Sequence, residues 1–452
     1  MSNPNKTLIW LRTSIRVCDN PLWSLTHALD QIEHVEVILT PCYGQDQQHG
    51  YGRRRTALKQ QAIKDFVAWA QSVHLKVTIS TADTYREAAA ELIALIHKHQ
   101  VSALWADREY GLNERRRDAW VGKQLAAANI PFQLSEDRLT FPPQEMLTQQ
   151  QKPYQIYTAF KKAWRARWQA NPQSVWPMPK WAIGLPNLEQ QAQNDLNQFV
   201  EQSVAQYDDR RNNLEPPIMS GLSPYNTIGL LNTRQAFAAV ASVPTSESIT
   251  TWLDEWIWRE FFYAVGYHFP DVYRRKALQA WTDAITWHKP DARLSAWQLG
   301  QTGYPIIDAA MRQLKATGRM PNRARMFTAA FLVKDLHVDW RHGESWFLQQ
   351  LHDADFAVNN GNWQWGASTG VDAAPYFRVF NPLRQAVRFD PDGDYVRAWV
   401  PELAHITGKD IHDPSTEQRQ SAGYPAPIVI HKEAAAATKA LFAAAKHKAA
   451  HS

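Results

Sequence analysis

The chain of 452 residues is long for one hydrophobic core and predicts two or three domains. Hydrophobic residues make up 44% and charged residues 21%, the ordinary composition of a globular protein. No run approaches the roughly 18 apolar residues of a membrane span, so the sequence predicts no membrane-spanning helix. The net charge of +5 permits nucleic-acid binding without requiring it, because a sum of charges says nothing about clustering.

Tryptophan is unusually frequent, with 20 residues, and such an excess suits aromatic binding sites and base-stacking surfaces. The only cysteines, Cys18 and Cys42, argue against a disulfide framework and fit a reducing compartment. The first residues lack the apolar core of a signal peptide, so we expect a cytoplasmic protein. The histidines are scattered and predict no metal site.

In the first part of the chain, short apolar runs alternate with helical patterns. The predicted strands are 7–11, 35–39, 75–79 and 101–105, and the predicted helices are 22–31, 54–73, 84–98 and 113–128. This alternation predicts an α/β domain with a parallel, Rossmann-like sheet over residues 1–135. No glycine-rich phosphate loop follows a strand, so any dinucleotide must be held in another way.

Residues 136–200 are rich in proline and glutamine and predict an interdomain linker, with one helix over 154–169. Strand alternation stops after that segment. Residues 201–452 therefore predict an all-α domain, with helices at 226–240, 249–265, 305–317, 322–338 and 343–351 and a terminal helix from 434 to 451.

The most informative stretch is 353–365, where two acids alternate with apolar residues before adjacent amides and two tryptophans. Buried amides and carboxylates need partners, and a solvated loop does not need the tryptophans. The mixture suits a polar, planar ligand buried among aromatic rings.

Three other clusters each allow two interpretations. Glu255, Trp258 and Arg259 share one helix face, where they form either a structural ion pair or part of a binding site. The ion pair is favoured because structural ion pairs are common. Arg325 is either part of a basic surface or the partner of Asp353 or Asp355. Residues 220–223 contain two serines and a glycine, which fit either a phosphate site or an ordinary helix cap.

Several long motifs occur in order between 252 and 382. They include Glu-Trp-Ile-Trp-Arg-Glu-Phe at 255–261, Trp-Gln-Leu-Gly-Gln-Thr-Gly-Tyr-Pro at 297–305, Asn-Asn-Gly-Asn-Trp-Gln-Trp at 359–365 and Asp-Ala-Ala-Pro-Tyr-Phe-Arg at 372–378. On these motifs the chain resembles the photolyase/cryptochrome family, and within it the class I cyclobutane pyrimidine dimer photolyases of bacterial type.

The resemblance implies that the helical domain is an FAD-binding domain. The cofactor-binding positions carried over from the family are Tyr207, Ser220, Gly221, Leu222, Ser223, Trp252, Glu255, Arg259, Asn322, Arg325, Asp353, Asp355 and Asn359. Of these, the resemblance implies that Asn359 faces the flavin N5. An uncharged amide there suits either redox state of the ring, whereas a carboxylate would repel the anionic reduced flavin.

The implied function is light-dependent repair of DNA, by electron transfer from excited reduced FAD to a flipped-out pyrimidine dimer. Glu255, Asn359 and Met326 are the implied catalytic residues. Trp287, Trp340 and Trp363 match the family's electron-transfer chain, with Trp287 nearest solvent. The implied DNA contacts are Arg211, Glu255, Trp258, Arg259, Asn322, Arg323, Met326, Trp365 and Arg378.

The resemblance also implies a methenyltetrahydrofolate antenna contacted by Asn113, Glu114 and Arg274. Some positions depart from the family: Ser14 replaces an aspartate, Met219 and Gly221 replace threonine and arginine, and Asn362 replaces a glycine. The resemblance implies that the partner is DNA containing pyrimidine dimers, and we expect a monomer with no membrane partner.

Two alternatives remain on the same fold. A cryptochrome-type blue-light photoreceptor is disfavoured because position 359 is Asn, where plant cryptochromes have Asp. It is also disfavoured because the resemblance implies a complete dimer pocket, made by Glu255, Trp258, Met326 and Trp365. The short Ala/Lys-rich segment after the helical domain also differs from a long signalling tail. Enzymes that repair the six-four photoproduct carry histidines in the segment that corresponds to residues 322–326. This chain has no histidine there, which disfavours that function.

Overall fold

The computed structural model describes residues 6–25, 32–215, 219–373 and 375–451. The chain packs into two compact units. Unit 1 contains Met1–Ala205 and Ser220–Pro270, and unit 2 contains Gln206–Met219 and Asp271–Ser452. The predicted boundaries at 135 and 200 stay predictions. The predicted fold class, an α/β part followed by a helical part, is confirmed.

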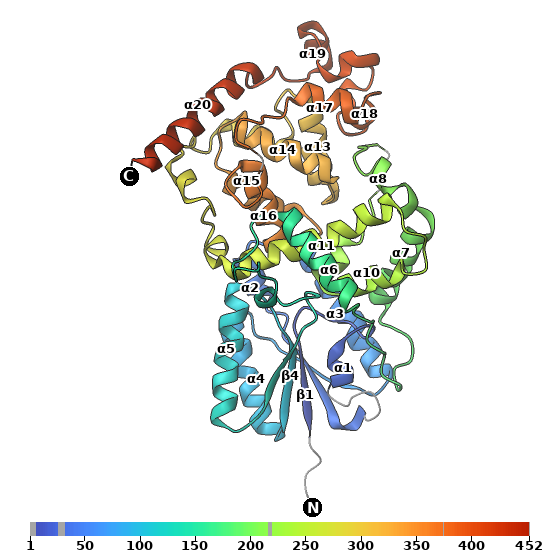
Figure 1. The fold of residues 1–452 in the computed structure, drawn as a ribbon. Helices are drawn as coiled ribbons and strands as arrows, with labels where there is room; N and C mark the ends of the chain where they lie inside the picture. Colours follow the sequence, from blue (N-terminus) through green and yellow to red (C-terminus); the bar gives the residue numbers. More distant parts are fainter. Residues whose placement is uncertain (1–5, 26–31, 216–218, 374, 452) are drawn as a thin grey trace, which may run out of the picture. The chain divides into compact units, whose positions relative to one another are not determined.

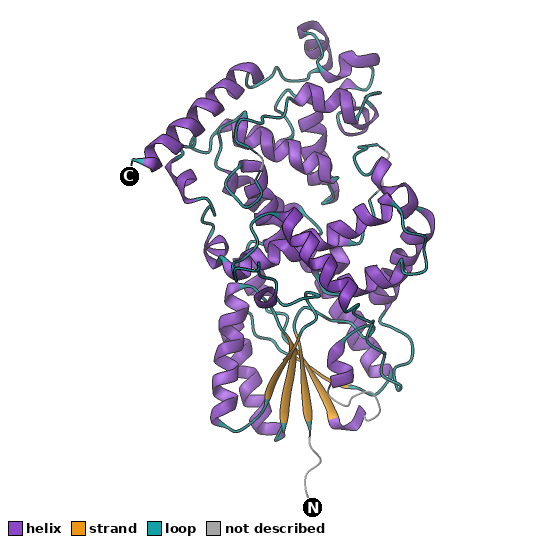
Figure 2. Ribbon diagram, in the orientation of Figure 1, coloured by secondary structure: helices purple, strands orange, loops and turns teal. Residues whose placement is uncertain are grey.

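Unit 1 is built on one sheet of five parallel strands in the order β3-β2-β1-β4-β5 (Figure 2). The strands are β1 (Thr7–Leu11), β2 (Val35–Leu39), β3 (Lys76–Ile79), β4 (Ala103–Asp107) and β5 (Phe132–Ser135). Ile9 lies opposite Val37 of β2 and Trp105 of β4, so β1 is central and buried on both faces.

Helices cover both faces of this sheet (Figure 1). On one face, Ile9 and Leu11 pack with Phe66 of α3 (Arg53–Ser72). On the other face, Leu8 and Trp10 pack with residues of α4 (Tyr85–His99) and α5 (Leu112–Ala127). This division follows from the strand period of two, which sends successive side chains to opposite faces.

The predicted elements of the sheet region are largely confirmed, with three differences. The fourth strand is shifted to Ala103–Asp107, and the strand β5 and the short helix α2 (Tyr43–Gln48) were not predicted. The predicted helix 22–31 is described only over α1 (Pro21–Leu25), since 26–31 lie outside the described residues, and Ile32–His34 form a 3-10 turn.

The rest of unit 1 is helical. The predicted linker contains a 3-10 turn (Pro143–Glu145) and two helices, α6 (Tyr157–Ala170) and α7 (Asn187–Gln202), the second of which was not predicted. The predicted helix 226–240 is divided into α9 (Ser223–Thr227) and α10 (Thr233–Ala239). Gly229 separates them at φ 78°, where an added Cβ would lie 2.5 Å from the Thr13 carbonyl oxygen. The long helix α11 (Glu247–His268) follows.

A buried ion cluster joins the first loop of the sheet to these helices. One carboxylate oxygen of Asp137 accepts hydrogen bonds from Arg16 and Arg234, each at 2.5 Å. Asp19 accepts from Arg234 at 3.2 Å and from Asn232 at 2.5 Å. The two arginines hold the pKa of Asp137 well below its usual range. Residues 16–19, 137 and 232–234 are thereby held together, although they are far apart in the chain.

The described residues of unit 2 form helices and turns, with no named strand. The α-helices are α8 (Tyr207–Arg210), α12 (Ala292–Leu299), α13 (Pro305–Thr317), α14 (Asn322–Lys334), α15 (Trp340–Gln350), α16 (Phe356–Ala367), α17 (Pro382–Phe389), α18 (Asp394–Trp399), α19 (Thr416–Ala422) and α20 (His431–Ala450). Helix α14 packs against α13, α15 and α16 and is buried through most of its length. Across the described ranges, no helix is both long and apolar enough to cross a bilayer.

Removing the central carboxylate of the ion cluster should destabilise unit 1. In Asp137→Asn, two buried guanidinium groups lose one of the two carboxylates that compensate their charge, so the free energy of unfolding should fall by about 3–5 kcal/mol. Urea titration followed by circular dichroism measures this change.

The matched control is Asp394→Asn, which breaks an exposed ion pair with Arg397. That change should cost less than about 1 kcal/mol. Equal losses in the two variants would contradict a structural role for the buried cluster.

Candidate functional site

The stretch 353–365 forms the start and body of helix α16. Asp355 is the N-cap, and its Oδ1 accepts the backbone N–H of Val358 at 3.3 Å. The side chains of Asn359 and Trp363, one turn apart, are buried, and Trp365 is half-buried. A polar helix N-terminus thus leads directly into an aromatic, amide-lined face.

An ion pair stands beside this helix start. Arg325 of α14 donates from Nη2 to both carboxylate oxygens of Asp353, at 3.1 and 2.9 Å. Its Nε donates to the Met320 carbonyl oxygen at 3.0 Å, which fixes the plane of the guanidinium group. Of the two predicted partners, Arg325 pairs with Asp353, because Asp355 serves as the helix cap.

Asn359 is held in one orientation. Its Nδ2 donates to the backbone carbonyl of Glu344 at 2.9 Å, and no hydrogen bond to its Oδ1 occurs within the described ranges. The Glu344 carboxylate accepts from Asn360 at 2.6 Å, and burial raises its pKa. The amide of Asn359 therefore has its nitrogen engaged and its oxygen available.

The first turn of α14 carries more of the predicted residues. Asn322 is exposed, and Arg323, Arg325 and Met326 are half-buried. Asn322, Arg325 and Met326 are spaced i, i+3 and i+4, so they lie on one side of the helix.

Unit 2 also contains a group of arginines. Arg323 donates twice to the Asn212 side chain, at 3.2 and 2.7 Å, and its guanidinium lies 4.5 Å from the Phe389 ring centroid. Burial and the nearby charges of Arg388 and Arg211 lower the pKa of Arg323. These positive charges repel one another, and a bound anion would relieve that repulsion. The group is therefore suited to bind an anion such as a phosphate. Arg388 was not identified from the sequence as a member of this group, although a basic residue on the amphipathic helix α17 could have indicated it.

The remaining predicted residues of unit 2 lie as follows. Tyr207 is the first residue of α8, and the Arg211 guanidinium lies 5.5 Å from its ring. Arg378 is exposed, and its backbone carbonyl accepts a hydrogen bond from the buried Lys334 at 3.1 Å. Burial lowers the pKa of Lys334 to about 8.

The three predicted electron-transfer tryptophans differ in their surroundings. Trp363 packs edge-on against Phe347 and Trp297, with ring centroids at 5.0 and 6.0 Å. Trp340 is completely buried at the start of α15. Trp287 is half-buried and packs against Phe442. Among the ring contacts of the described residues, no pair joins two of these three tryptophans directly.

In unit 1, helix α11 carries the predicted site residues Trp252, Glu255, Trp258 and Arg259. Trp252 is buried against Phe199. Trp258 is half-buried and stacks on Tyr157, with centroids 3.5 Å apart and planes within 9°. Tyr157 belongs to the segment predicted as a linker and was missed as a neighbour of the site.

Three neighbouring charged residues of α11 have different surroundings. Arg259 is buried, donates to the Arg138 carbonyl at 3.0 Å and lies over the Tyr263 ring. Asp254 accepts from Lys161 at 2.8 Å and from Arg165 at 2.6 Å, so it anchors α6. Glu255, the next residue, is half-buried.

The loop before α9 contains the predicted phosphate residues. Gly221 has φ 69°, and Ser220 accepts the backbone N–H of Leu222 at 3.4 Å. Leu222 is buried, Met219 and Ser223 are exposed, and Ser223 begins α9. This arrangement leaves the loop with a left-handed turn, which a glycine accommodates without strain.

The predicted antenna residues have partners in the protein. Asn113 contacts the His49 ring nitrogen at 3.0 Å, and Glu114 accepts from the Tyr85 hydroxyl at 2.9 Å. Arg274, in unit 2, pairs with Asp271 at 2.9 Å.

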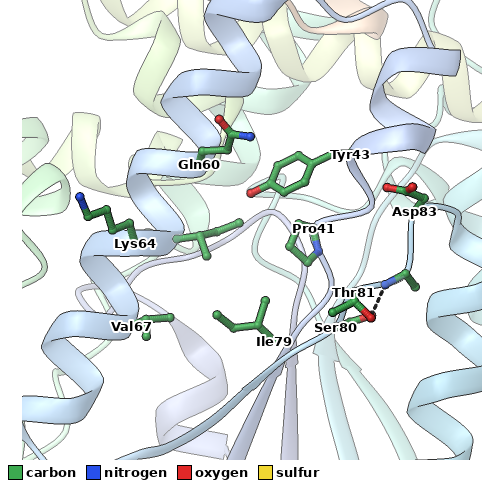
Figure 3. A pocket seen from close by; sticks show the side chains of 11 residues that line it. Pro41, Tyr43, Gln60, Lys64, Val67, Ile79, Ser80, Thr81 and Asp83 are labelled. Atoms are coloured by element: carbon green, nitrogen blue, oxygen red, sulfur yellow. Dashed lines mark hydrogen bonds between the residues drawn. The ribbon is translucent and has the colours of Figure 1, made fainter.

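Unit 1 also has a hollow of about 480 Å³ where β2 and β3 end (Figure 3). Ile63, Val67 and Ile79 line its apolar part, and Tyr43, Gln60 and Ser80 supply polar groups. Neither Asn113 nor Glu114 lines it.

Comparison with known proteins agrees with these features. Residues 7–180 match the family model described as "DNA photolyase", and residues 252–444 match the "FAD binding domain of DNA photolyase". The deoxyribodipyrimidine photo-lyase of Escherichia coli (strain K12) is 40% identical over 380 residues, covering 77% of this chain and 80% of that protein.

Two further proteins match over almost their whole length. The deoxyribodipyrimidine photo-lyase of Vibrio cholerae is 33% identical and covers 97% of this chain and 99% of that protein. A class III photolyase structure from Agrobacterium tumefaciens has a TM-score of 0.83 at 29% identity, covering 99% of both chains. With its α/β sheet, its helical unit and these matches, the chain belongs to the DNA photolyase family and carries that family's FAD-binding domain.

Proposed function

We propose that this protein is a deoxyribodipyrimidine photo-lyase, which uses light to split cyclobutane pyrimidine dimers in DNA. The relatives named above bear that name and match over most of their length. The observation that carries the proposal is the polar start of α16, where the Arg325–Asp353 pair, Asp355 and an oriented Asn359 come together. Bound FAD, in its reduced anionic form, supplies the light-excited electron for the reaction.

The polar groups of unit 2 fit the flavin ring. Arg325 and Asp353 combine a donor and an acceptor in one rigid pair, and this mixed set suits the edge of a ring that has both kinds of group. Asp355 adds a carboxylate at a helix N-terminus. We assign the ring contacts to Arg325, Asp353, Asp355 and Asn359, and contacts elsewhere on the cofactor to Tyr207, Ser220, Gly221, Leu222, Ser223, Trp252, Glu255, Arg259 and Asn322.

The orientation of Asn359 gives it a defined role. Because its nitrogen already donates to the Glu344 carbonyl, its oxygen can accept a hydrogen bond from the protonated N5 of a reduced flavin. The amide carries no charge, so it does not oppose the anionic ring. We therefore assign to Asn359 the stabilisation of the reduced cofactor, and to Glu344 the orientation of Asn359.

DNA contacts are assigned within each unit separately. In unit 1, Trp258 has Tyr157 on one face of its indole, which makes it a rigid aromatic surface for a base, and Glu255 supplies a carboxyl group for the polar edge of the dimer. In unit 2, Met326 and Trp365 supply apolar and aromatic surface. A dimer stacks poorly, so moving it out of the duplex costs less than moving a normal base.

Phosphate contacts follow from the arginines. A region of positive potential is formed by Arg211, Arg323 and Arg388. These charges act on one another, because Arg211 and Arg388 lower the pKa of Arg323. We assign them to the DNA backbone, with Arg378 and Arg259 as further contacts. Such contacts supply affinity that falls with salt and is independent of sequence.

We also propose that Trp363, Trp340 and Trp287 carry electrons that restore the reduced cofactor. Helices α15 and α16 pack together, and Gly343 of α15 lies against the Trp363 indole, where an added Cβ would come within 2.1 Å of a ring carbon. Trp340 is three residues before Gly343 and so lies on the same side of α15. The half-buried Trp287 is then the outermost member.

A methenyltetrahydrofolate antenna is a further part of this proposal. Asn113 and Glu114 lie at the start of α5, close to Tyr85 and His49, and offer amide and carboxylate groups to a pterin. We also assign Arg274 to the antenna ligand, on the family resemblance. The monomeric state and the cytoplasmic location stay predictions.

A repair assay tests the main proposal. Purified protein with fully reduced flavin is mixed with an oligonucleotide that contains one dimer, then illuminated with near-ultraviolet or blue light, and dimer loss is measured by chromatography. We expect loss only in the light and only with the reduced cofactor. An absence of light-dependent loss would refute the proposal and favour a photoreceptor.

Replacing Glu255 should affect repair more than binding. Glu255→Ala removes the carboxyl group that we assign to the dimer's polar edge, so the repair yield per absorbed photon should fall about three- to ten-fold, a cost within the range for one hydrogen bond. Affinity for dimer-containing DNA, measured by fluorescence anisotropy, should change less than the yield.

The neighbouring carboxylate provides the control. Asp254→Ala removes ion pairs to Lys161 and Arg165 and should lower stability while sparing the yield of the folded fraction. Equal losses of yield and affinity in Glu255→Ala would mean that Glu255 only positions the DNA.

Displacing Trp363 should slow photoreduction of the flavin. In Gly343→Ala the new methyl group must push the Trp363 indole aside, because it would overlap two ring carbons at 2.1 and 2.5 Å. Photoreduction, followed by flavin absorbance, should slow at least several-fold, towards the rate of Trp363→Phe, while chemically reduced protein still repairs dimers.

Gly366→Ala is the matched control on the facing helix. Its Cβ would meet the Ala329 Cβ at an ordinary 3.6 Å, so photoreduction should keep its normal rate. Normal photoreduction in Gly343→Ala and in Trp363→Phe would remove Trp363 from the electron route.

A further inference from the structure

Phe442 of helix α20 is surrounded by three other aromatic side chains of unit 2. The Tyr376 ring stacks parallel to it, with centroids 5.8 Å apart and planes within 7°. Trp287 and Trp281 meet it edge-on, at 6.1 and 6.3 Å. Phe442 itself is completely buried, whereas the other three rings are half-buried.

Helix α20 is held firmly over this group. Its buried residues, Ala434, Thr438, Phe442 and Ala445, recur at helical spacing and form one face. The Thr438 hydroxyl lies 2.8 Å from the His337 ring nitrogen and also donates to the Lys334 carbonyl oxygen. These bonds fix the depth and rotation of the helix, and so they fix Phe442 between the three rings.

The arrangement brings together side chains that can lose one electron. Indole and phenol rings are oxidised far more easily than the phenyl ring of Phe442, which has no heteroatom to stabilise the positive charge. Trp287, the outermost tryptophan of the proposed electron route, is thus separated from two further oxidisable rings by a single phenylalanine.

We propose that Tyr376 is the terminal electron donor of this route. The inference rests on the proposed function of Trp287, Trp340 and Trp363. When Trp287 has lost an electron and is a radical cation, Tyr376 gives it one electron. The phenolic O–H bond breaks in the same event, and its proton passes to water at the half-exposed ring. The products are neutral Trp287, a neutral Tyr376 radical and one solvated proton.

The loss of the proton explains why the charge stays on Tyr376. An electron that returns must be accompanied by a proton from water, which makes the return slower than simple electron exchange between tryptophans. Trp281 lies at a similar distance from Phe442, and its indole N–H donates to the Gln279 side chain at 2.8 Å. That bond keeps the Trp281 nitrogen in a protein contact, whereas the phenol can release its proton to solvent.

Tyr376→Phe tests the proposal, since it keeps a ring to stack on Phe442 and removes only the hydroxyl. After flash excitation of the FAD-loaded protein, transient absorption distinguishes tryptophanyl from tyrosyl radicals. The unaltered protein should form a tyrosyl radical as the tryptophanyl signal decays. The variant should keep the tryptophanyl signal and lose its separated charge at least about ten-fold faster.

Two further variants sharpen the result. Trp281→Phe should still form the tyrosyl radical, and so should Tyr43→Phe, which alters a tyrosine at the hollow in unit 1. Loss of the late radical in Trp281→Phe, with normal behaviour in Tyr376→Phe, would overturn the proposal. A tryptophanyl radical without any tyrosyl radical in the unaltered protein would overturn it while leaving the electron route intact. No tryptophanyl radical at all would refute both.

A cofactor-independent measurement completes the test. A photosensitised ruthenium oxidant in solution replaces light absorbed by the flavin, and a spin trap marks the radical site for mass spectrometry. An adduct on Tyr376 should form in the unaltered protein, and the adduct on Trp287 should increase in Tyr376→Phe. Equal amounts of Trp287 adduct in the two proteins would contradict the proposal.

Discussion

The buried ion cluster around Asp137 is the constraint on which unit 1 depends. Charges removed from water are tolerated only when each has a partner, so Arg16, Arg234, Asp19 and Asp137 must all be in place at once. The cluster therefore ties the loop after β1 to the segment after β5 and to α10. Because α11 follows α10 in the same unit, the residues of α11 that are assigned to cofactor and DNA depend on this cluster for their position within unit 1.

Unit 2 uses the same physical principle closer to the site. The buried amides and carboxylates of α15 and α16 satisfy one another, and the orientation of Asn359 is a consequence of that pairing. The aromatic residues are held by packing instead. Gly343 leaves room for the Trp363 indole, and helix α20 holds Phe442 against the Tyr376 ring. Polar partners set hydrogen-bonding direction, and packing sets the positions of the redox-active rings.

Several elements could be predicted because their patterns are local. Strand β1 is a continuous apolar run after Thr7, β2 is apolar except for Glu36, and α13 matches its predicted bounds of 305–317. Strand β5 was missed because four residues carry too little periodicity, and α7 because its sequence is rich in Asn and Gln. The predicted helix 226–240 was interrupted because Gly229 packs on the backbone of Thr13, a contact more than 200 positions away in the chain.

The amino-acid sequence by itself determined the family and the types of residue available at the site, because long motifs in fixed order carry that information. Only the tertiary structure decided how those residues are used. It paired Arg325 with Asp353 because Asp355 caps α16, and it engaged the Asn359 nitrogen with the Glu344 carbonyl. It also placed Arg388 beside Arg323 and Tyr376 against Phe442. The physical reason is that hydrogen bonds, charge interactions and ring contacts depend on distance and direction in space, and these arise only when distant segments pack together.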